Sequence, residues 1–178
     1  MKPKALLIAA FTAVLLTGLG SLWLAPGRLQ QAPEISFTTL RGQHLSMASL
    51  RGRPVLVNFW ASTCRGCLEE MPELVKLYKD FAPRGLAVIG IAMAYDPPDH
   101  VVALSKARNI PYPIALDINS KAARAFGDVG VTPTSFLVAP DGRVVHRKTG
   151  ELDIHEVRQL IAGMLTASVA GAQTTAVN

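Results

Sequence analysis

The feature that most constrains the fold is an apolar run that ends just before the only two cysteines of the chain. Residues 54–61, PVLVNFWA, are almost continuously apolar and rich in valine and aromatic side chains, which is typical of a strand buried on both faces of a sheet. Residues 64–81 then place apolar side chains at three- and four-residue steps, which predicts a helix. A buried strand that leads into an amphipathic helix predicts an α/β domain with the cysteines at the carboxyl edge of its sheet.

The rest of the chain continues this alternation of strand and helix. Residues 34–52 predict two short strands and a helical turn. The further expected elements are strands at 86–93 and 112–117, a hairpin at 134–150, and helices at 97–109, 120–127 and 153–165. This order predicts a three-layer α/β domain over residues 34–165, with a central mixed sheet flanked by helices.

The first 25 residues carry a second constraint. After Lys2 and Lys4, residues 5–25 contain no charged side chain, and a helix of this length spans about 30 Å, the hydrocarbon thickness of a bilayer. The two lysines predict an amino end that stays in the cytoplasm. We expect residues 1–25 to be an uncleaved signal anchor, a transmembrane helix; a cleaved signal peptide and a buried soluble helix are the alternatives.

Both membrane-related interpretations of this segment place the remainder of the chain outside the cytoplasm. Residues 26–33 contain the proline, glycine and glutamine of a short linker. Residues 166–178 are small and polar, and we expect them to be a disordered tail.

Cys64 and Cys67 are compatible with a metal site, a structural disulfide or a redox couple. Zinc needs four ligands, and the histidines are scattered singly through the chain, at His44, His100, His146 and His155. Attachment of c-type haem needs histidine after the second cysteine, where Leu68 stands. A disulfide across two intervening residues closes the kind of small loop that stabilises a fold least. The pair is therefore predicted to be a redox-active dithiol, without a metal or another cofactor.

The position of the pair at a helix start predicts different roles for the two sulfurs. Unpaired N–H groups and the positive end of the helix dipole stabilise a thiolate at Cys64, and Arg65 adds a positive charge beside it. Cys67 lies one turn further along, on the apolar face, and is expected to be less exposed. Cys64 is thus the expected nucleophile toward a substrate disulfide, and Cys67 the thiol that resolves the mixed disulfide.

The motifs around the cysteines resemble a known family. VNFWASTCRGCLEEMPEL at 57–74, followed by GVTPTSFLVAPDGRVV at 130–145, is similar to the membrane-anchored TlpA/ResA/DsbE-type thiol-disulfide oxidoreductases. The resemblance implies a thioredoxin fold with a TlpA-like additional helix and strand in residues 94–117. It also implies that the neighbours of the reacting pair are Trp60, Thr63, Arg65 and Gly66.

The resemblance implies a substrate site and partners as well. Thr132-Pro133 would be a cis peptide bond facing the cysteines, and the Thr132 backbone would pair with an extended substrate segment. The family reduces disulfides of envelope proteins, such as apocytochrome c or copper-site thiols, with electrons from a membrane donor of the DsbD/CcdA type. The chain would then be a single-pass protein of the bacterial inner membrane with its catalytic domain in the periplasm, or soluble there if residues 1–25 are cleaved.

Two departures from the thioredoxin pattern concern the chemistry. Thr63 stands where thioredoxins usually carry tryptophan, and Asn58 stands where they carry a buried, proton-exchanging aspartate. In TlpA/ResA-like proteins a glutamate three residues beyond the second cysteine is implicated instead, and Glu70 matches it. The apolar neighbours of Glu70 on the predicted helix would raise its pKa. A solvated helix glutamate, like Glu69, is the alternative.

Two other classes of function stay open. A peroxiredoxin-like peroxidase shares the fold but needs a Pro-x-x-x-Thr-x-x-Cys pocket; here Ala61 occupies the threonine position and Phe59 lies near the proline position. A non-catalytic protein would use the same thiols to handle copper or haem. Basic and acidic residues alternate and the net charge is only +5, so we expect no nucleic-acid partner.

Overall fold

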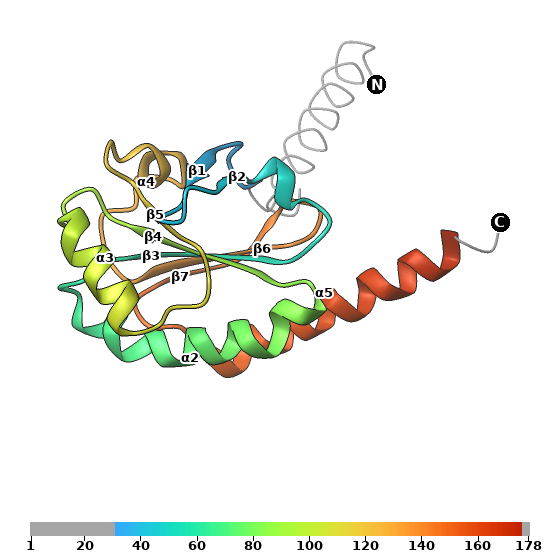
Figure 1. Ribbon diagram of the computed structural model, residues 1–178. Helices are drawn as coiled ribbons and strands as arrows, with labels where there is room; N and C mark the ends of the chain where they lie inside the picture. Colours follow the sequence, from blue (N-terminus) through green and yellow to red (C-terminus); the bar gives the residue numbers. More distant parts are fainter. Residues whose placement is uncertain (1–30, 176–178) are drawn as a thin grey trace, which may run out of the picture.

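The computed structural model describes residues 31–175 (Figure 1). Their elements are β1 (Ser36–Thr38), β2 (His44–Ser46), the 3-10 turn η1 (Ala48–Leu50), β3 (Val55–Trp60), α2 (Arg65–Phe81), η2 (Ala82–Arg84), β4 (Ala87–Ala92), α3 (Pro98–Ala107), β5 (Ile114–Leu116), α4 (Lys121–Ala125), β6 (Thr134–Val138), β7 (Val144–Thr149) and α5 (Ile154–Thr175). The predicted alternation of strand and helix from β3 onward is confirmed.

The central sheet is mixed and has β3 in its middle. Its five strands are ordered β5-β4-β3-β6-β7; β4 runs parallel to β3 and β5 parallel to β4, while β6 pairs with β3, and β7 with β6, antiparallel. All six residues of β3 are buried, because a central strand with both faces covered has no solvent side. The carboxyl ends of β3, β4 and β5 therefore share one edge of the sheet.

Two layers cover the sheet. The helices α2 and α5 lie along one face with α3 beside them, and the β1–β2 hairpin, η1 and α4 lie on the other (Figure 1). The residues of β3 alternate between these layers: Leu56 and Trp60 face α2, while Val57 and Phe59 face the hairpin side, as the two-residue period of a strand requires. This arrangement is the thioredoxin fold that the sequence predicts.

The additional helix and strand implied by the resemblance are α3 and β5. The strand β5 lies at the edge of the sheet, and the chain just after β1 covers that edge. Leu40 donates its backbone N–H to Ile114 at 2.8 Å, and Thr39 forms a single bridge with Ala115. The inserted elements are thus integrated into the sheet.

The predicted domain limits need two corrections. The end of the expected linker already belongs to the domain, because Gln31 pairs with Arg143 and Ala32 is buried with its N–H donated to Gly142. The expected disordered tail is helical as far as Thr175. A helix already nucleated by its packed first turns extends into residues 166–175 without a further nucleation cost.

The predicted signal anchor at 1–25 and the first part of the linker lie outside the described residues, as do residues 176–178. Within residues 31–175, none of the helices combines the length and the apolar character that crossing a bilayer requires. The anchor accordingly stays a prediction from the sequence.

Candidate active site

The cysteine pair lies where β3 gives way to α2. Cys64 is the N-cap of α2, and its Sγ accepts a hydrogen bond from the Cys67 N–H at 3.2 Å. The two side chains form a disulfide with their Cα atoms 5.3 Å apart. Cys67 is buried, 4% exposed, whereas Cys64 is half-buried. When the pair is reduced, the same N–H groups favour a thiolate at Cys64, which is also the more accessible sulfur.

A buried carboxylate holds the turn before Cys64. Ser62 donates both its backbone N–H and its hydroxyl to Asp96, each at 2.5 Å, and Asp96 is only 4% exposed. The Cys64 N–H closes the turn onto Ala61 at 3.1 Å. Sequence reasoning missed Asp96. The position of Asp96 could have indicated its role, because it follows β4 at the same edge of the sheet at which β3 ends and the cysteine motif begins.

The loop before β6 approaches the middle of the cysteine motif. Thr132-Pro133 is a cis peptide bond, as the resemblance implies. A Cβ atom on Gly66 would lie 3.7 Å from Pro133 Cδ and 3.1 Å from Glu151 Oε1. Pro133 is therefore against the motif, and the Glu151 side chain takes the space that a residue larger than glycine would fill.

Glu70 is enclosed by the protein. It is 6% exposed, and neither carboxyl oxygen has a hydrogen-bond partner. Burial raises the pKa of Glu70 to about 7; the nearby Leu152 amide opposes this rise without reaching hydrogen-bond geometry, and the charge of Glu151 adds to it. The alternative of a solvated surface glutamate is wrong for Glu70, whereas Glu69 is exposed.

Arg65 forms an ion pair with Glu69, so its charge does not act on Cys64 alone. Its guanidinium bonds Glu69 at 2.8 Å, four residues along α2, and its side chain is 90% exposed. The expected positive charge beside Cys64 is thus partly neutralised and largely solvated, which weakens its effect on the thiolate. Thr63, the residue directly before Cys64, is exposed.

Two aromatic residues enclose the interior side of the site. Trp60 is 2% exposed and its Nε1 has no hydrogen-bond partner. Tyr112 is 3% exposed and packs edge-on against Tyr78 of α2, with ring centroids 6.0 Å apart. Burial raises the pKa of Tyr112 strongly, and the charge of Glu70 raises it further. Tyr112 therefore stays a neutral phenol near Glu70, and the sequence offered no signal for this proximity.

Asn58 is held within the sheet. Its Nδ2 donates to Ser135 Oγ at 2.9 Å, and the two residues are direct partners between β3 and β6. Both are buried, so this amide is satisfied by its cross-strand neighbour. The site has no acid at this position.

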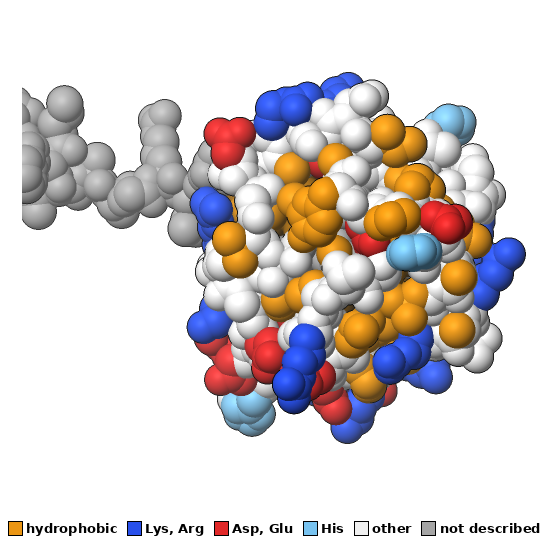
Figure 2. All heavy atoms as spheres, turned by 90° about the vertical axis from the view of Figure 1, so that its left-hand side faces the viewer, with side chains coloured by type: hydrophobic (Ala, Val, Ile, Leu, Met, Phe, Trp, Pro, Cys, Tyr) orange, Lys and Arg blue, Asp and Glu red, His pale blue; other side chains and the backbone are white. Residues whose placement is uncertain are grey.

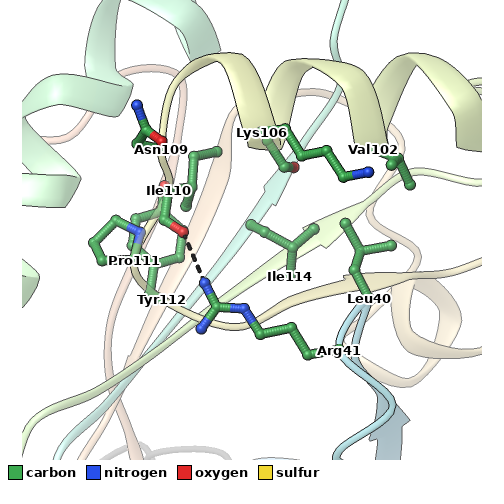
Figure 3. Close-up of a pocket in the computed structure, with 10 residues that line it drawn as sticks. Leu40, Arg41, Val102, Lys106, Asn109, Ile110, Pro111, Tyr112 and Ile114 are labelled. Carbon is green, nitrogen blue, oxygen red and sulfur yellow. Dashed lines mark hydrogen bonds between the residues drawn. The ribbon is translucent and has the colours of Figure 1, made fainter.

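One cavity in the described part of the chain is separate from the cysteines. It has a volume of about 500 Å³ and lies between α3 and residues 109–114, where Arg41 donates to the Ile110 carbonyl at 3.5 Å (Figure 3). Tyr112 lines it, but none of the predicted site residues does. Within residues 31–175 there is also no group of three or more acidic, histidine or cysteine side chains placed to hold a metal ion.

Comparisons with known proteins agree with this geometry. A family model described as the AhpC/TSA family matches residues 29–147. The thiol-disulfide oxidoreductase ResA of Bacillus thuringiensis (strain Al Hakam) is 31% identical over 163 residues, covering 85% of this chain and 91% of that protein. The thioredoxin-like protein YneN of Bacillus subtilis (strain 168) is 33% identical over 132 residues, covering 73% of this chain and 76% of that protein.

A solved structure extends the likeness to three dimensions. The crystal structure of a thiol:disulfide interchange protein of the thioredoxin family from Chlorobium tepidum TLS superposes with a TM-score of 0.71 at 31% identity, covering 79% of this chain and 99% of that one. With the Cys64–Cys67 disulfide at the start of α2, the chain belongs to the AhpC/TSA family and, within it, to the ResA-like thiol-disulfide oxidoreductases.

Proposed function

We propose that this oxidoreductase works as a reductase of disulfides in proteins outside the cytoplasm. The observation that carries the proposal is the asymmetry of the pair, with Cys64 capping α2 and half-buried, and Cys67 buried one turn inside. An accessible sulfur with a stabilised thiolate suits attack on a large substrate. A shielded second sulfur suits the resolving step, which needs no access to solvent.

The reaction proceeds by two exchanges in which atoms and electrons balance. The Cys64 thiolate attacks one sulfur of the client disulfide, so that a mixed disulfide forms and the other client sulfur leaves as a thiolate. The Cys67 thiolate then attacks Cys64 Sγ, which forms the Cys64–Cys67 disulfide and releases the second client thiolate. The client gains two electrons and, after protonation, two protons. A thiol donor restores the pair by the reverse exchanges.

Glu70 is the proposed group that exchanges a proton with Cys67. Its carboxyl is buried, free of hydrogen bonds and has a pKa of about 7, so it holds and releases a proton near neutral pH. It lies three residues after Cys67 on α2, a spacing that puts two side chains on one helix face. Asn58, bound to Ser135, leaves this task to Glu70.

The charges near the pair favour the reducing direction. A stabilised thiolate makes a dithiol couple more oxidising, and the cation closest in sequence, Arg65, is bound to Glu69. Glu151 places a carboxylate oxygen beside Gly66, and Glu70 adds a second negative charge once it ionises. Both carboxylates disfavour thiolates, which makes the couple more reducing.

The proposed setting follows from the sequence outside the described residues. Residues 5–25 carry no charge and follow two lysines, which supports a single-pass anchor in the bacterial inner membrane with the domain in the periplasm, or a soluble periplasmic form after cleavage. The proposed partners are disulfide-bonded client proteins, such as those of cytochrome c maturation or metal-site assembly, and a membrane thiol donor of the DsbD/CcdA type.

The reduction potential of the Cys64–Cys67 couple tests this proposal. The full chain is equilibrated in thiol buffers of graded potential, and the fraction oxidised is measured by thiol trapping and mass spectrometry. We expect a value near that of thioredoxin, about −270 mV, and not near that of the oxidant DsbA, about −120 mV. A value near the oxidant's would contradict the reductase direction while leaving the oxidoreductase chemistry intact.

The peroxidase alternative finds no support in the geometry of the site. Ala61 and Val57, at the positions of the threonine and the proline of a peroxidase pocket, are both 0% exposed and apolar, so neither orients a peroxide. Titration of the reduced full chain with hydrogen peroxide and with a disulfide peptide separates the two activities. Metal analysis of the purified protein tests the remaining alternative, a thiol protein that handles copper or haem.

A further inference from the structure

One loop bridges the two halves of the active site. Residues 93–97 follow β4, and the loop starts with the Met93 N–H bound to the Trp60 carbonyl at 3.0 Å. Asp96 in this loop accepts both hydrogen bonds from Ser62, before the cysteines. The Tyr95 hydroxyl shares a hydrogen bond of 3.2 Å with Thr132 Oγ1, beside the cis proline. The loop is therefore fixed both to the segment before Cys64 and to the segment that carries the cis proline.

Tyr95 is exposed although it is fixed at its tip. Among the residues that the structure describes, the exposed large apolar side chains are Tyr95 at 60%, Ile118 at 67% and Val131 at 60%. They come from the loops that follow β4 and β5 and precede β6, so all three lie at the edge of the sheet that carries Cys64. Figure 2 views this edge and shows apolar side chains gathered across its middle, with most charged side chains toward the rim.

Position in the sheet separates these three side chains. The strands β4 and β6 both neighbour β3, which leads to Cys64, whereas β5 lies one strand further away. Tyr95 and Val131 therefore lie on the two sides of the end of β3 that leads to Cys64, where the resemblance implies that an extended client segment pairs with Thr132. Ile118, after β5, lies one strand further away.

We propose that Tyr95 is a specificity-determining residue that selects clients with an apolar side chain next to the reacting cysteine. This rests on the proposed function, because the client is taken to be an extended protein segment. The Tyr95 hydroxyl is already bound to Thr132 and the loop is anchored through Asp96, so the ring offers apolar area with little loss of conformational entropy on binding. A polar side chain at the same place gains no such contact.

Two cyclic disulfide peptides test the proposal. They are identical except that the residue before each cysteine is leucine in one and asparagine, of similar size, in the other. The full chain is mixed with each peptide in the presence of a thiol donor that returns the Cys64–Cys67 pair to the dithiol, and kcat/KM is measured for each peptide. We expect wild type to prefer the leucine peptide about fivefold to tenfold, through KM, since burying part of a leucine contributes about 1 kcal/mol.

Variants assign the preference to the ring. Tyr95→Ala should bring the ratio of the two kcat/KM values close to one, Tyr95→Phe should keep most of it, and Ile118→Ala should leave it at the wild-type value. An unchanged ratio in Tyr95→Ala overturns the proposal, as does a ratio lost equally in Tyr95→Phe, which would assign it to the Thr132 loop. A wild type that reduces both peptides equally also overturns it, whereas one that reduces neither contradicts the proposed function itself.

Discussion

The two faces of the central sheet both carry an apolar core, but they differ in how their buried polar groups are satisfied. On the face covered by the β1–β2 hairpin and α4, the core is aromatic and aliphatic, and the buried Asp117 accepts two backbone N–H bonds from the start of α4. On the face covered by α2, α3 and α5, several buried side-chain atoms have no partner within the described residues. They are Trp60 Nε1, both Glu70 oxygens, Ser105 Oγ and His146 Nε2.

The buried polar groups without partners are connected with the chemistry of the site. A buried polar group without a partner costs free energy, and natural domains keep such groups few. Here two of them, Trp60 and Glu70, belong to the layer that holds the cysteines. Both faces stabilise the fold through apolar burial, and the α2 face also holds a carboxyl group whose proton is available near neutral pH.

The largest expected effect concerns the two cysteines, which belong to the face covered by α2. Cys64→Ser should reduce disulfide exchange to background and trap no client, since it removes the attacking thiolate. Cys67→Ser should accumulate mixed disulfides through Cys64, because the resolving thiol is missing. The adducts are counted on non-reducing gels after acid quenching and identified by mass spectrometry. Equal trapping by both variants would refute this order of attack.

The next largest effect concerns stability and lies on the opposite face. Phe136 is 3% exposed and packs against Phe126 and Phe59, with ring centroids 4.9 and 5.9 Å away. Phe136→Ala should lower the free energy of unfolding by about 3–5 kcal/mol, through lost burial and a residual cavity. Urea unfolding of the oxidised chain measures this. The reduction potential, measured on molecules that remain folded, should stay at the wild-type value. A large change of the potential would show that packing on the hairpin face also controls the chemistry of the cysteines.

A smaller effect, with a definite pH dependence, concerns Glu70. Its pKa rises from an ordinary 4.5 to about 7 on folding, so between these values the native protein holds a proton that the unfolded chain has released. The free energy of unfolding therefore falls as pH increases through this window, by up to about 3 kcal/mol, and levels off above it. Glu70→Gln should remove that slope. Urea unfolding of the oxidised protein from pH 4 to pH 8 compares the two chains.

The same variant reports on proton transfer. If Glu70 exchanges a proton with Cys67, Glu70→Gln should slow disulfide exchange by about tenfold to a hundredfold and flatten its pH dependence near pH 7. Stopped-flow traces with a disulfide peptide give these rates. A variant that follows wild type from acid to alkaline pH would show that the proton takes another path, even if the stability slope changes as expected.

The sequence predicted the part of this site that depends on local order. An apolar run followed by a helical period locates β3 and α2. These two elements place Cys64 at a helix start, and this prediction needs no information from the rest of the chain. The burial of Glu70 also followed from its apolar neighbours on α2. The four-residue spacing of Arg65 and Glu69 predicts an ion pair on one helix face, and that pair limits the effect of Arg65 on Cys64.

The contacts that depend on tertiary structure were not predictable in this way. Asp96 meets Ser62, and Tyr112 approaches Glu70, only because β4 and β5 bring distant loops to the same edge and face of the sheet. The tail was mispredicted for a related reason. Composition indicated disorder, whereas a helix started by packed residues such as Val157 and Ile161 continues without a new nucleation cost.

The smallest expected effect separates Glu69 from its buried neighbour. Glu69→Gln breaks an exposed pair with Arg65, whose side chains are 52% and 90% exposed, so stability should fall by only about 0.3–0.5 kcal/mol. Arg65 is then free to act on Cys64, and a slightly stabilised thiolate makes the couple more oxidising, by about 10 mV or less. Salt at 1 M should abolish this shift, because screening then acts within about 3 Å. A much larger shift of the reduction potential in Glu69→Gln, or one that persists in high salt, would mean that exposed charges control the cysteine pair.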